Sequence, residues 1–240
     1  MISRLGLTGA LVSFGDRLDE EANRAAVAFR ARIEAEDLEV IEETSTSLTS
    51  VFVRFDALRT DYETIADCLL SLLEERDWMT AELPVGRRLW RIPVTFGGEH
   101  GPQLEEVASL AGVRAEQAVQ ELTGQNVRVL ALGFAPGQPY LGILPEHWNI
   151  PRQAGLTPQV PEGALVVAVR QFVLFTIASP TGWRQVGRTA FRCFRPAEDP
   201  PFPLRPGDEV RFVAVSAEEM ARIEASTGDG SGGAMTEPLP

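Results

Sequence analysis

Apolar residues in the first part of the chain alternate between short runs and helical spacing, which predicts strands and helices in turn. The run from Leu7 to Phe14 is short, and Gly15 and Asp16 end it, as expected for a strand that leads into a turn. Asp19 follows as a candidate helix N-cap. After it, apolar residues recur every three or four positions, which indicates an amphipathic helix: Ala22, Ala25, Ala26, Phe29 and Ile33.

The same alternation continues to residue 96. Residues 38–41 and 51–55 predict strands, and Asp61 is a candidate cap for a second helix. Residues 89–96 predict the strand that closes the unit. The order strand, helix, strand, strand, helix, strand is the split βαβ pattern, so residues 1–96 are expected to form a ferredoxin-like βαββαβ domain.

A helical connection is expected over residues 97–125. Glycines mark a break at residues 97–101, and residues 104–110 and 115–122 then predict short helices. Gly112 lies between them and suits a left-handed helix C-cap.

The remaining chain reads as a β-rich domain over residues 126–224. Short β-rich runs alternate with glycine and proline, which indicates a closed barrel or a sandwich: 127–132, 164–169, 172–177, 183–186 and 210–215. A short helix is expected over 217–224. Residues 225–240 are rich in Gly, Ser and Pro, and the composition predicts a disordered tail. The fold class is therefore α+β, a ferredoxin-like domain followed by a β domain.

Composition narrows the classes of partner and compartment. The net charge of −12 would repel a long polyanion, which disfavours nucleic acid. No apolar run reaches the roughly 18 residues of a membrane helix, and no signal-peptide pattern opens the chain. Cys68 and Cys193 have no CxxC partner and are expected to be buried free thiols. These features predict a cytoplasmic protein without membrane contact.

One basic stretch interrupts the acidic chain. Between residues 170 and 195 it carries no Asp or Glu but has Arg170, Arg184, Arg188, Arg192 and Arg195. Such a patch suggests a small anionic ligand or an acidic partner surface. The alternative, left open by the sequence, is arginines scattered over exposed strand faces.

Several common catalytic motifs are missing. The chain has no GxGxxG, no GxxxxGK[ST] and no GxSxG motif, so it offers neither a familiar phosphate loop nor a nucleophile elbow. His100 and His147 lack ligand spacing to each other or to the cysteines, so we expect surface or loop histidines and no metal site.

Glycine- and proline-anchored loops are the remaining candidates for a site. Gly97 and Gly98 permit positive φ and could turn backbone N–H groups inward as an anion-binding nest, although a plain domain linker fits equally well. The segment 133–142 holds three glycines and two prolines, among them Gly137. Its Phe134 and Tyr140 could wall a pocket, and Tyr140 offers a hydroxyl.

Two further loops carry arginines. Arg152 follows Pro151, and its planar guanidinium suits a carboxylate or a phosphate. Residues 179–189 form a tight turn with Trp183 and end on Arg188 and Thr189. Trp183 fits a core anchor or, alternatively, a stacking platform.

Together and in this order, these loops resemble one protein family. The family includes the B-type subunit of 5-oxoprolinase, allophanate hydrolase subunit 1 and a sporulation-kinase inhibitor, and it is similar to one half of the carboxyltransferase domain of urea carboxylase. The resemblance runs from about residue 7 to about residue 224. The matching segments are FGGEHGPQLEEVA (96–108), GFAPGQPYLGILP (133–145), PR (151–152), VPEGALVVA (160–168), SPTGWRQVGRT (179–189) and RPGDEVRF (205–212).

The resemblance implies a ferredoxin-like N-terminal domain and a cyclophilin-like C-terminal β-barrel. It also implies a related partner, the C-type subunit or carboxyltransferase subunit 2, in a heterodimer or heterotetramer with a ligand cleft between two barrels. In the 5-oxoprolinase system such a complex opens 5-oxoproline to L-glutamate with ATP as co-substrate, and no tightly bound cofactor is expected.

A division of roles follows for a positioning and electrostatic mechanism. Arg152 and Arg188 are expected to hold an anionic group, and Gln171 is expected to orient a carbonyl or an amide. Ligand contacts are expected from Gly97, Gly98, Gly137, Tyr140 and Trp183.

The chain departs from the usual family pattern at polar positions that we expect to face the cleft. It has Gln103 where an acidic residue is common, and Phe175 where relatives carry a tyrosine. Other departures are Gln138, Gln159, Phe172 and Val173. Two other functions therefore stay open beside the oxoprolinase hypothesis: carboxyl transfer in a biotin-dependent urea or amide carboxylase, and non-catalytic inhibition of a histidine kinase.

Overall fold

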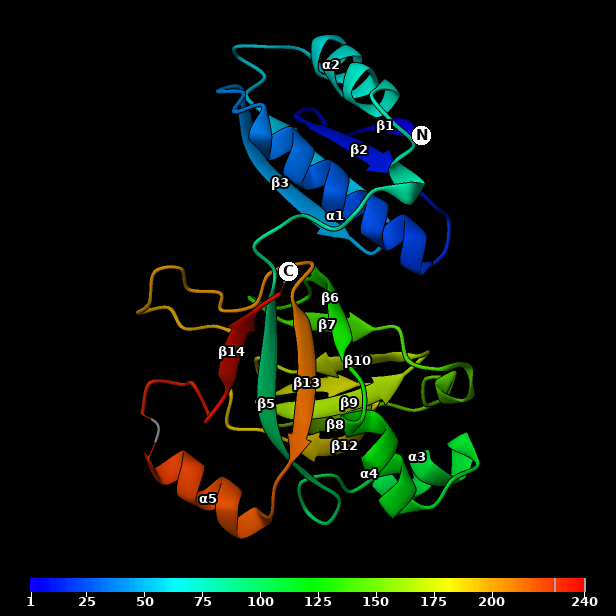
Figure 1. Ribbon diagram of the computed structural model, residues 1–240, viewed down its shortest axis with the longest axis vertical. Coiled ribbons are helices and arrows are strands. Elements are labelled where there is room, and N and C mark those ends of the chain that lie inside the picture. Colours follow the sequence, from blue (N-terminus) through cyan, green and yellow to red (C-terminus); the bar gives the residue numbers. More distant parts are fainter. Residues whose placement is uncertain (227, 240) are drawn as a thin grey trace. The chain divides into compact units, whose positions relative to one another are not determined.

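The chain divides after Val85 into two units that each have their own hydrophobic core (Figure 1). The computed structural model describes residues 1–226 and 228–239. None of the helices in this part of the chain combines the length and the apolar character that crossing a bilayer requires.

The first unit, Met1–Val85, is an antiparallel sheet with both of its long helices on one face. The strand order is β1-β2-β4-β3. The elements are β1 (Ile2–Leu5), β2 (Gly9–Ser13), α1 (Glu20–Ala35), β3 (Ile41–Ser47), β4 (Ser50–Phe55), α2 (Tyr62–Glu74) and the 3-10 turn η1 (Trp78–Thr80). Both predicted caps are confirmed, since Asp19 accepts the Glu21 and Ala22 N–H groups and Asp61 accepts the Thr64 N–H at 2.8 Å.

The strand that completes this sheet is not the one predicted. The predicted strand 7–14 is shorter in the structure, as β2, and a turn over residues 6–8, with φ +68° at Gly6, joins it to β1 in a hairpin. β1 takes the edge beside β2 that the predicted strand 89–96 would occupy in a ferredoxin-like sheet. The spatial arrangement is ferredoxin-like as expected, but the chain supplies its fourth strand from the N-terminal side.

The second unit, Gly86–Pro240, is a closed β-barrel, which confirms the predicted fold class. Its strands follow the order β12-β9-β10-β7-β6-β13-β5, and pairing of β12 with β5 closes the ring. The barrel strands are β5 (Arg88–Phe96), β6 (Val127–Leu132), β7 (Pro139–Gly142), β9 (Ala164–Ala168), β10 (Gln171–Leu174), β12 (Arg184–Arg188) and β13 (Glu209–Ala214).

The domain boundary predicted at residue 96 is therefore wrong. β5 pairs with β12 and, in parallel, with β13, so the barrel begins before the predicted helical connection. α3 (Leu104–Ala111) and α4 (Ala115–Thr123) form as predicted, with Gly112 as the left-handed cap at φ +75°. They connect strands of the same unit and contribute to its core.

Both faces of β9 and β10 are buried, which positions the candidate site. Leu165 and Phe172 belong to the core inside the barrel, whereas Val166 and Val173 belong to a separate outer cluster. Val160 and Trp183 also belong to this outer cluster; Val160 ends β8 (Thr157–Val160), which pairs with β11 (Ser179–Thr181) in a small ribbon. The outer cluster therefore gives the loops around Trp183 a firm base.

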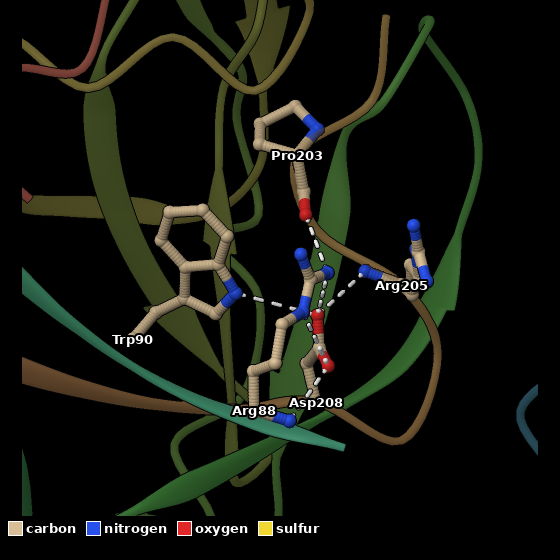
Figure 2. A network of polar contacts seen from close by, with 5 residues as sticks. All are labelled: Arg88, Trp90, Pro203, Arg205 and Asp208. Carbon is tan, nitrogen blue, oxygen red and sulfur yellow. Dashed lines mark hydrogen bonds and ion pairs between the residues drawn. The ribbon is translucent and has the colours of Figure 1, made fainter. Parts of the chain in front are cut away.

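A buried carboxylate fixes the parallel pair β5–β13 (Figure 2). Asp208 is 2% exposed and lies just before β13. Its Oδ2 accepts Nη2–H of Arg88 at 2.6 Å and the indole N–H of Trp90 at 3.3 Å, and it also accepts the Arg205 backbone N–H. Arg88 in turn donates to the Pro203 carbonyl at 2.7 Å. One side chain thus joins the start of β5 to the turn before β13.

The segment predicted as a disordered tail, 225–240, is ordered over its described residues, whereas residues 227 and 240 lie outside them. α5 (Ala217–Ser226) is followed by turns and then by β14 (Met235–Pro238), which pairs with β5 at Arg88–Arg91. Gly232 has φ +54°, and a Cβ there would lie 2.3 Å from the Phe191 nitrogen. Glycines therefore let this segment lie directly against the barrel, although their abundance led to the prediction of disorder.

Replacing Asp208 with Asn should destabilise the barrel unit by about 3 kcal/mol, because the neutral amide leaves the Arg88 guanidinium without its buried counter-charge. Chemical denaturation, followed by a spectroscopic signal that reports the unfolding of the barrel unit, measures this loss of stability. Glu237→Gln is the matched control. Glu237 pairs at 3.0 Å with Arg91, which lies on β5 like Arg88, but this pair is exposed and should contribute less than about 1 kcal/mol. Equal denaturation midpoints for wild type and Asp208→Asn would contradict the assignment.

Replacing Gly232 with Ala should release β14 from β5, since the new Cβ has no room beside Phe191. Hydrogen exchange of the amides in β5 and β14 should then become faster, while exchange in the first unit stays unchanged. Gly228→Ala is the control, because a Cβ at Gly228 meets nothing within 4 Å. Unchanged exchange in Gly232→Ala would show that the segment does not depend on this contact.

Candidate functional site

A cavity of about 200 Å³ lies over the outer cluster of the barrel. It unites the loop before β7, the segment after Pro151 and the turn after β11, so it brings together Tyr140, Arg152 and Trp183, three of the candidate site residues. The described residues that line it are Phe134, Gln138, Tyr140, Arg152, Leu156, Val173, Phe175, Pro180, Thr181, Gly182 and Trp183. We call it the Arg152 pocket.

Stacked side chains form the wall of the Arg152 pocket. The Tyr140 and Trp183 rings meet edge to face, with centroids 6.2 Å apart and planes at 74°. The guanidinium carbon of Arg152 lies 5.3 Å from the centre of the Trp183 ring, within cation–π range. Trp183 is 6% exposed and belongs to the outer cluster. It is thus both of the things that the sequence left open, a core anchor and a stacking surface.

The charge of Arg152 is available to a ligand. Its side chain is exposed, and no carboxylate of the described residues pairs with it. The described residues of the lining include no Asp, Glu, His or Cys. A pocket of this kind can bind and orient an anion against an aromatic surface, but its lining offers no general base of ordinary pKa near neutrality.

Some of the residues that depart from the family pattern lie in the floor of the pocket. Gln138 is 1% exposed, and its Oε1 accepts the Thr176 N–H at 3.5 Å. Val173 and Phe175 line the cavity beside it, as expected. Phe172 does not, because it points into the barrel and meets the Phe212 ring at 5.3 Å. The predicted cleft position of Phe172 was therefore wrong, and Gln159 lies exposed on β8 outside the lining.

Sequence reasoning missed the amide side chains that hold the pocket loops. Gln153 donates to the Trp183 carbonyl at 3.0 Å and to Thr157, and its Oε1 accepts from Gln103 at 2.8 Å. Gln103 also accepts the Gln185 backbone N–H at 2.9 Å. Gln103 is thus a supporting residue behind the pocket rather than a cleft residue. Its departure from the family pattern was the sole sequence signal for this chain of contacts.

The predicted backbone anion sites have structural roles. Gly97 and Gly98 do adopt positive φ, +70° and +53°. The Gly97 N–H, however, donates to the Val186 carbonyl at 3.1 Å, and the His100 and Gly101 N–H groups both donate to the Gly97 carbonyl. A Cβ on Gly137 would lie 2.3 Å from the Cys193 carbonyl oxygen, so that glycine permits a close chain contact. The expected nest at Gly97 and Gly98 is a turn fastened to β12.

Arg188 and Gln171 do not join the Arg152 pocket. Arg188 lies at the end of β12 and lines a different cavity, together with Glu224 and Arg192. The expected clamp of Arg152 and Arg188 on one anion therefore does not form within one cavity of this chain. Gln171 is 5% exposed, is paired in register with Gly142 and Ala168, and lies outside the lining. Its role stays a prediction.

The arginines between residues 170 and 195 do not form one open basic patch. Arg170 pairs with Glu146 at 2.7 Å, Arg184 with Glu106 at 2.7 Å, and Arg195 with Glu198 at 3.3 Å. Acidic residues from elsewhere in the chain therefore neutralise most of the stretch. Both cysteines are free thiols as predicted, but only Cys193 is buried, whereas Cys68 is partly exposed. Burial raises the pKa of the Cys193 thiol and, to a smaller extent, that of Cys68, which disfavours thiolate chemistry.

Comparison with known families gives a match over most of the chain. The family model for the carboxyltransferase domain, subdomains C and D, matches residues 1–204. A Bacillus subtilis (strain 168) protein, named as the B-type subunit of 5-oxoprolinase, is 32% identical over 228 residues, which is 91% of this chain and 94% of that protein.

Solved structures agree on the fold. The crystal structure of TTHA0988 is 29% identical with a TM-score of 0.73, over 90% of this chain and 41% of that one, so this chain spans less than half of that protein. Kluyveromyces lactis urea carboxylase shares the fold at 20% identity with a TM-score of 0.78, over 99% of this chain and 24% of that one. The chain belongs to the carboxyltransferase-domain family of subdomains C and D, together with the relatives named as B-type subunits of 5-oxoprolinase.

Proposed function

We propose that this chain is the B-type component of a 5-oxoprolinase-like complex, which opens 5-oxoproline to L-glutamate with ATP. The observation that carries the proposal is the match, nearly end to end, with the Bacillus subtilis protein named as a 5-oxoprolinase component of this type. The Arg152 pocket is the proposed contact with the substrate.

The chemistry of the pocket suits a small cyclic carboxylate. A guanidinium can donate two parallel hydrogen bonds to a carboxylate, and Arg152 has no acidic partner that competes for them among the described residues. The Trp183 and Tyr140 rings offer an apolar wall for a five-membered ring. A cavity of about 200 Å³ favours a compact ligand over a nucleotide, so we assign ATP to another part of the complex.

The chain is proposed to depend on a partner for its chemistry. The described lining of the pocket has no carboxylate, imidazole or thiol that could act as a base or a nucleophile. Phe134 and Leu156 at its rim are 73% and 69% exposed, which is typical of surfaces that a partner covers. A C-type partner barrel (carboxyltransferase subunit 2), in a heterodimer or heterotetramer, would cover this rim and supply the missing groups.

Carboxyl transfer is the second candidate, and the match to a carboxyltransferase-domain model favours it. The same pocket would then receive a urea-like or amide acceptor. The two functions differ in the co-substrate, since one requires ATP with 5-oxoproline and the other requires carboxybiotin. Assays of one purified complex with each set of substrates separate them.

In the reconstituted complex, Arg152→Ala should lower kcat/KM for 5-oxoproline about ten- to a hundredfold, because a charge-assisted pair of hydrogen bonds contributes roughly 1.5–3 kcal/mol. Arg152→Lys should recover only part of the loss, since an ammonium cannot make the paired contact. Steady-state kinetics at saturating ATP measure both variants.

Arg59→Ala is the control, because Arg59 is a half-exposed surface arginine of the first unit, paired with Glu39. Size-exclusion chromatography should show the same assembly for all variants. Wild-type kcat/KM in an intact Arg152→Ala complex would remove Arg152 from the substrate site. A wild-type complex that turns over carboxybiotin but not 5-oxoproline would replace the proposed function by carboxyl transfer.

A further inference from the structure

A second and larger cavity lies at the far end of β12, where Arg188 ends the strand. It measures about 400 Å³, within the usual range of small-molecule sites, roughly 300–1,000 Å³. Its charged lining consists of Arg188, Arg192, Glu162 and Glu224. Glu224 and the glycine-rich segment at Gly230 lie beyond residues 1–204, which the family model covers.

The oppositely charged groups around this cavity lie within ion-pair range of one another but do not form hydrogen bonds. Arg188 Nη2 lies 3.9 Å from Glu224, and Arg192 Nε lies 3.7 Å from Glu162. Both separations exceed hydrogen-bond length, and the structure gives these side chains no other polar partner among the described residues. The Arg188 Nε is moreover buried without a hydrogen-bond partner in that part of the chain.

This state sets the cavity apart from the rest of the basic stretch. Arg170 and Arg184 each approach a carboxylate at 2.7 Å, and each also donates to a backbone carbonyl at that distance. The donors of Arg188 and Arg192 are unfilled in comparison. Guanidinium and carboxylate groups without hydrogen-bond partners thus line the same cavity. Such a cavity is suited to a ligand that carries both a negative and a positive charge.

Backbone contacts hold the walls that carry these groups. Gly163, with φ +79°, approaches the Thr189 carbonyl so closely that a Cβ would lie 2.2 Å from its oxygen. The Arg192 N–H donates to the Gly230 carbonyl at 2.9 Å, which fastens the C-terminal segment to the far wall. These two contacts join the described parts of the lining on either side of the cavity.

We propose that this cavity binds an α-amino acid as its zwitterion, at a site separate from the Arg152 pocket. The ligand carboxylate would take the donors of Arg188 and Arg192, and its ammonium would lie against Glu224 and Glu162. An anion without an ammonium would face two uncompensated carboxylates, and a cation alone would face two guanidinium groups. The lining therefore requires both charges on one small molecule. This requirement does not depend on the reaction proposed for the Arg152 pocket.

Calorimetric titration of residues 1–240 with each of the common L-amino acids tests the proposal. For each amino acid that binds, the deaminated acid and the decarboxylated amine should bind at least about tenfold more weakly, a difference of about 1.4 kcal/mol. Glu224→Gln and Arg188→Gln should each weaken binding at least about tenfold as well. Both residues are half-exposed, with side chains 45% and 40% accessible, so their variants should fold.

Two controls locate the binding. Glu218→Gln removes an acid from the first turn of the same helix, α5, outside the lining, and should bind like wild type. Arg152→Ala should also leave amino-acid binding unchanged, because Arg152 lines the other cavity. Failure of every amino acid to bind, equal binding of the singly charged analogues, or wild-type affinity in Glu224→Gln and Arg188→Gln would overturn the proposal. Loss in Arg152→Ala alone would place the amino acid in the Arg152 pocket and would overturn it too.

Discussion

The carboxylate of Asp208 is the constraint on which the barrel unit depends. Parallel strands cannot be joined by a tight turn, so the pairing of β5 with β13 must come from contacts distant in sequence. Asp208 supplies them by accepting from the Arg88 guanidinium, the Arg88 backbone and the Trp90 indole at once (Figure 2). Because it is 2% exposed, these bonds are protected from water, and removing one partner would leave a buried charge alone.

Closing the barrel at β5 has consequences on both of its sides. One edge of β5 receives β13, and its other edge receives β12 near Phe96 and β14 near Arg88. β12 then places Arg184 beside Glu106 and leads from Trp183, in the wall of the Arg152 pocket, to Arg188 in the second cavity. Two cavities of different charge thus lie at the two ends of one strand. One has a single available cation over aromatic rings, and the other has two charges of each sign.

Local signals in the sequence predicted what local chemistry decides. Asp19 and Asp61 cap the beginnings of their helices and Gly112 caps the end of another, as expected, because a side-chain oxygen or a positive φ acts within one turn. The partners of residues 89–96 could not be predicted in this way, because they are β12 and β13, strands that lie far along the chain, and because the Asp208 carboxylate that binds Arg88 is more than a hundred residues away. The C-terminal segment was mispredicted for a related reason: Gly232 fits against Phe191, and composition alone does not show such a fit.

Within the candidate site, the glycine- and proline-rich loops pointed to Tyr140, Arg152 and Trp183, which line one cavity. The supporting amides Gln103 and Gln153 have no periodic pattern to reveal them.

The Arg152 pocket is proposed to hold the carboxylate of a small cyclic substrate, and a partner is proposed to complete the site. A crystal structure of the assembled complex with 5-oxoproline tests it most directly. The substrate carboxylate should lie within hydrogen-bond distance of the Arg152 guanidinium and the substrate ring against Trp183. A partner residue should lie across the mouth of the pocket near Phe134 and Leu156. Substrate bound elsewhere, with the Arg152 guanidinium in open solvent, would contradict it.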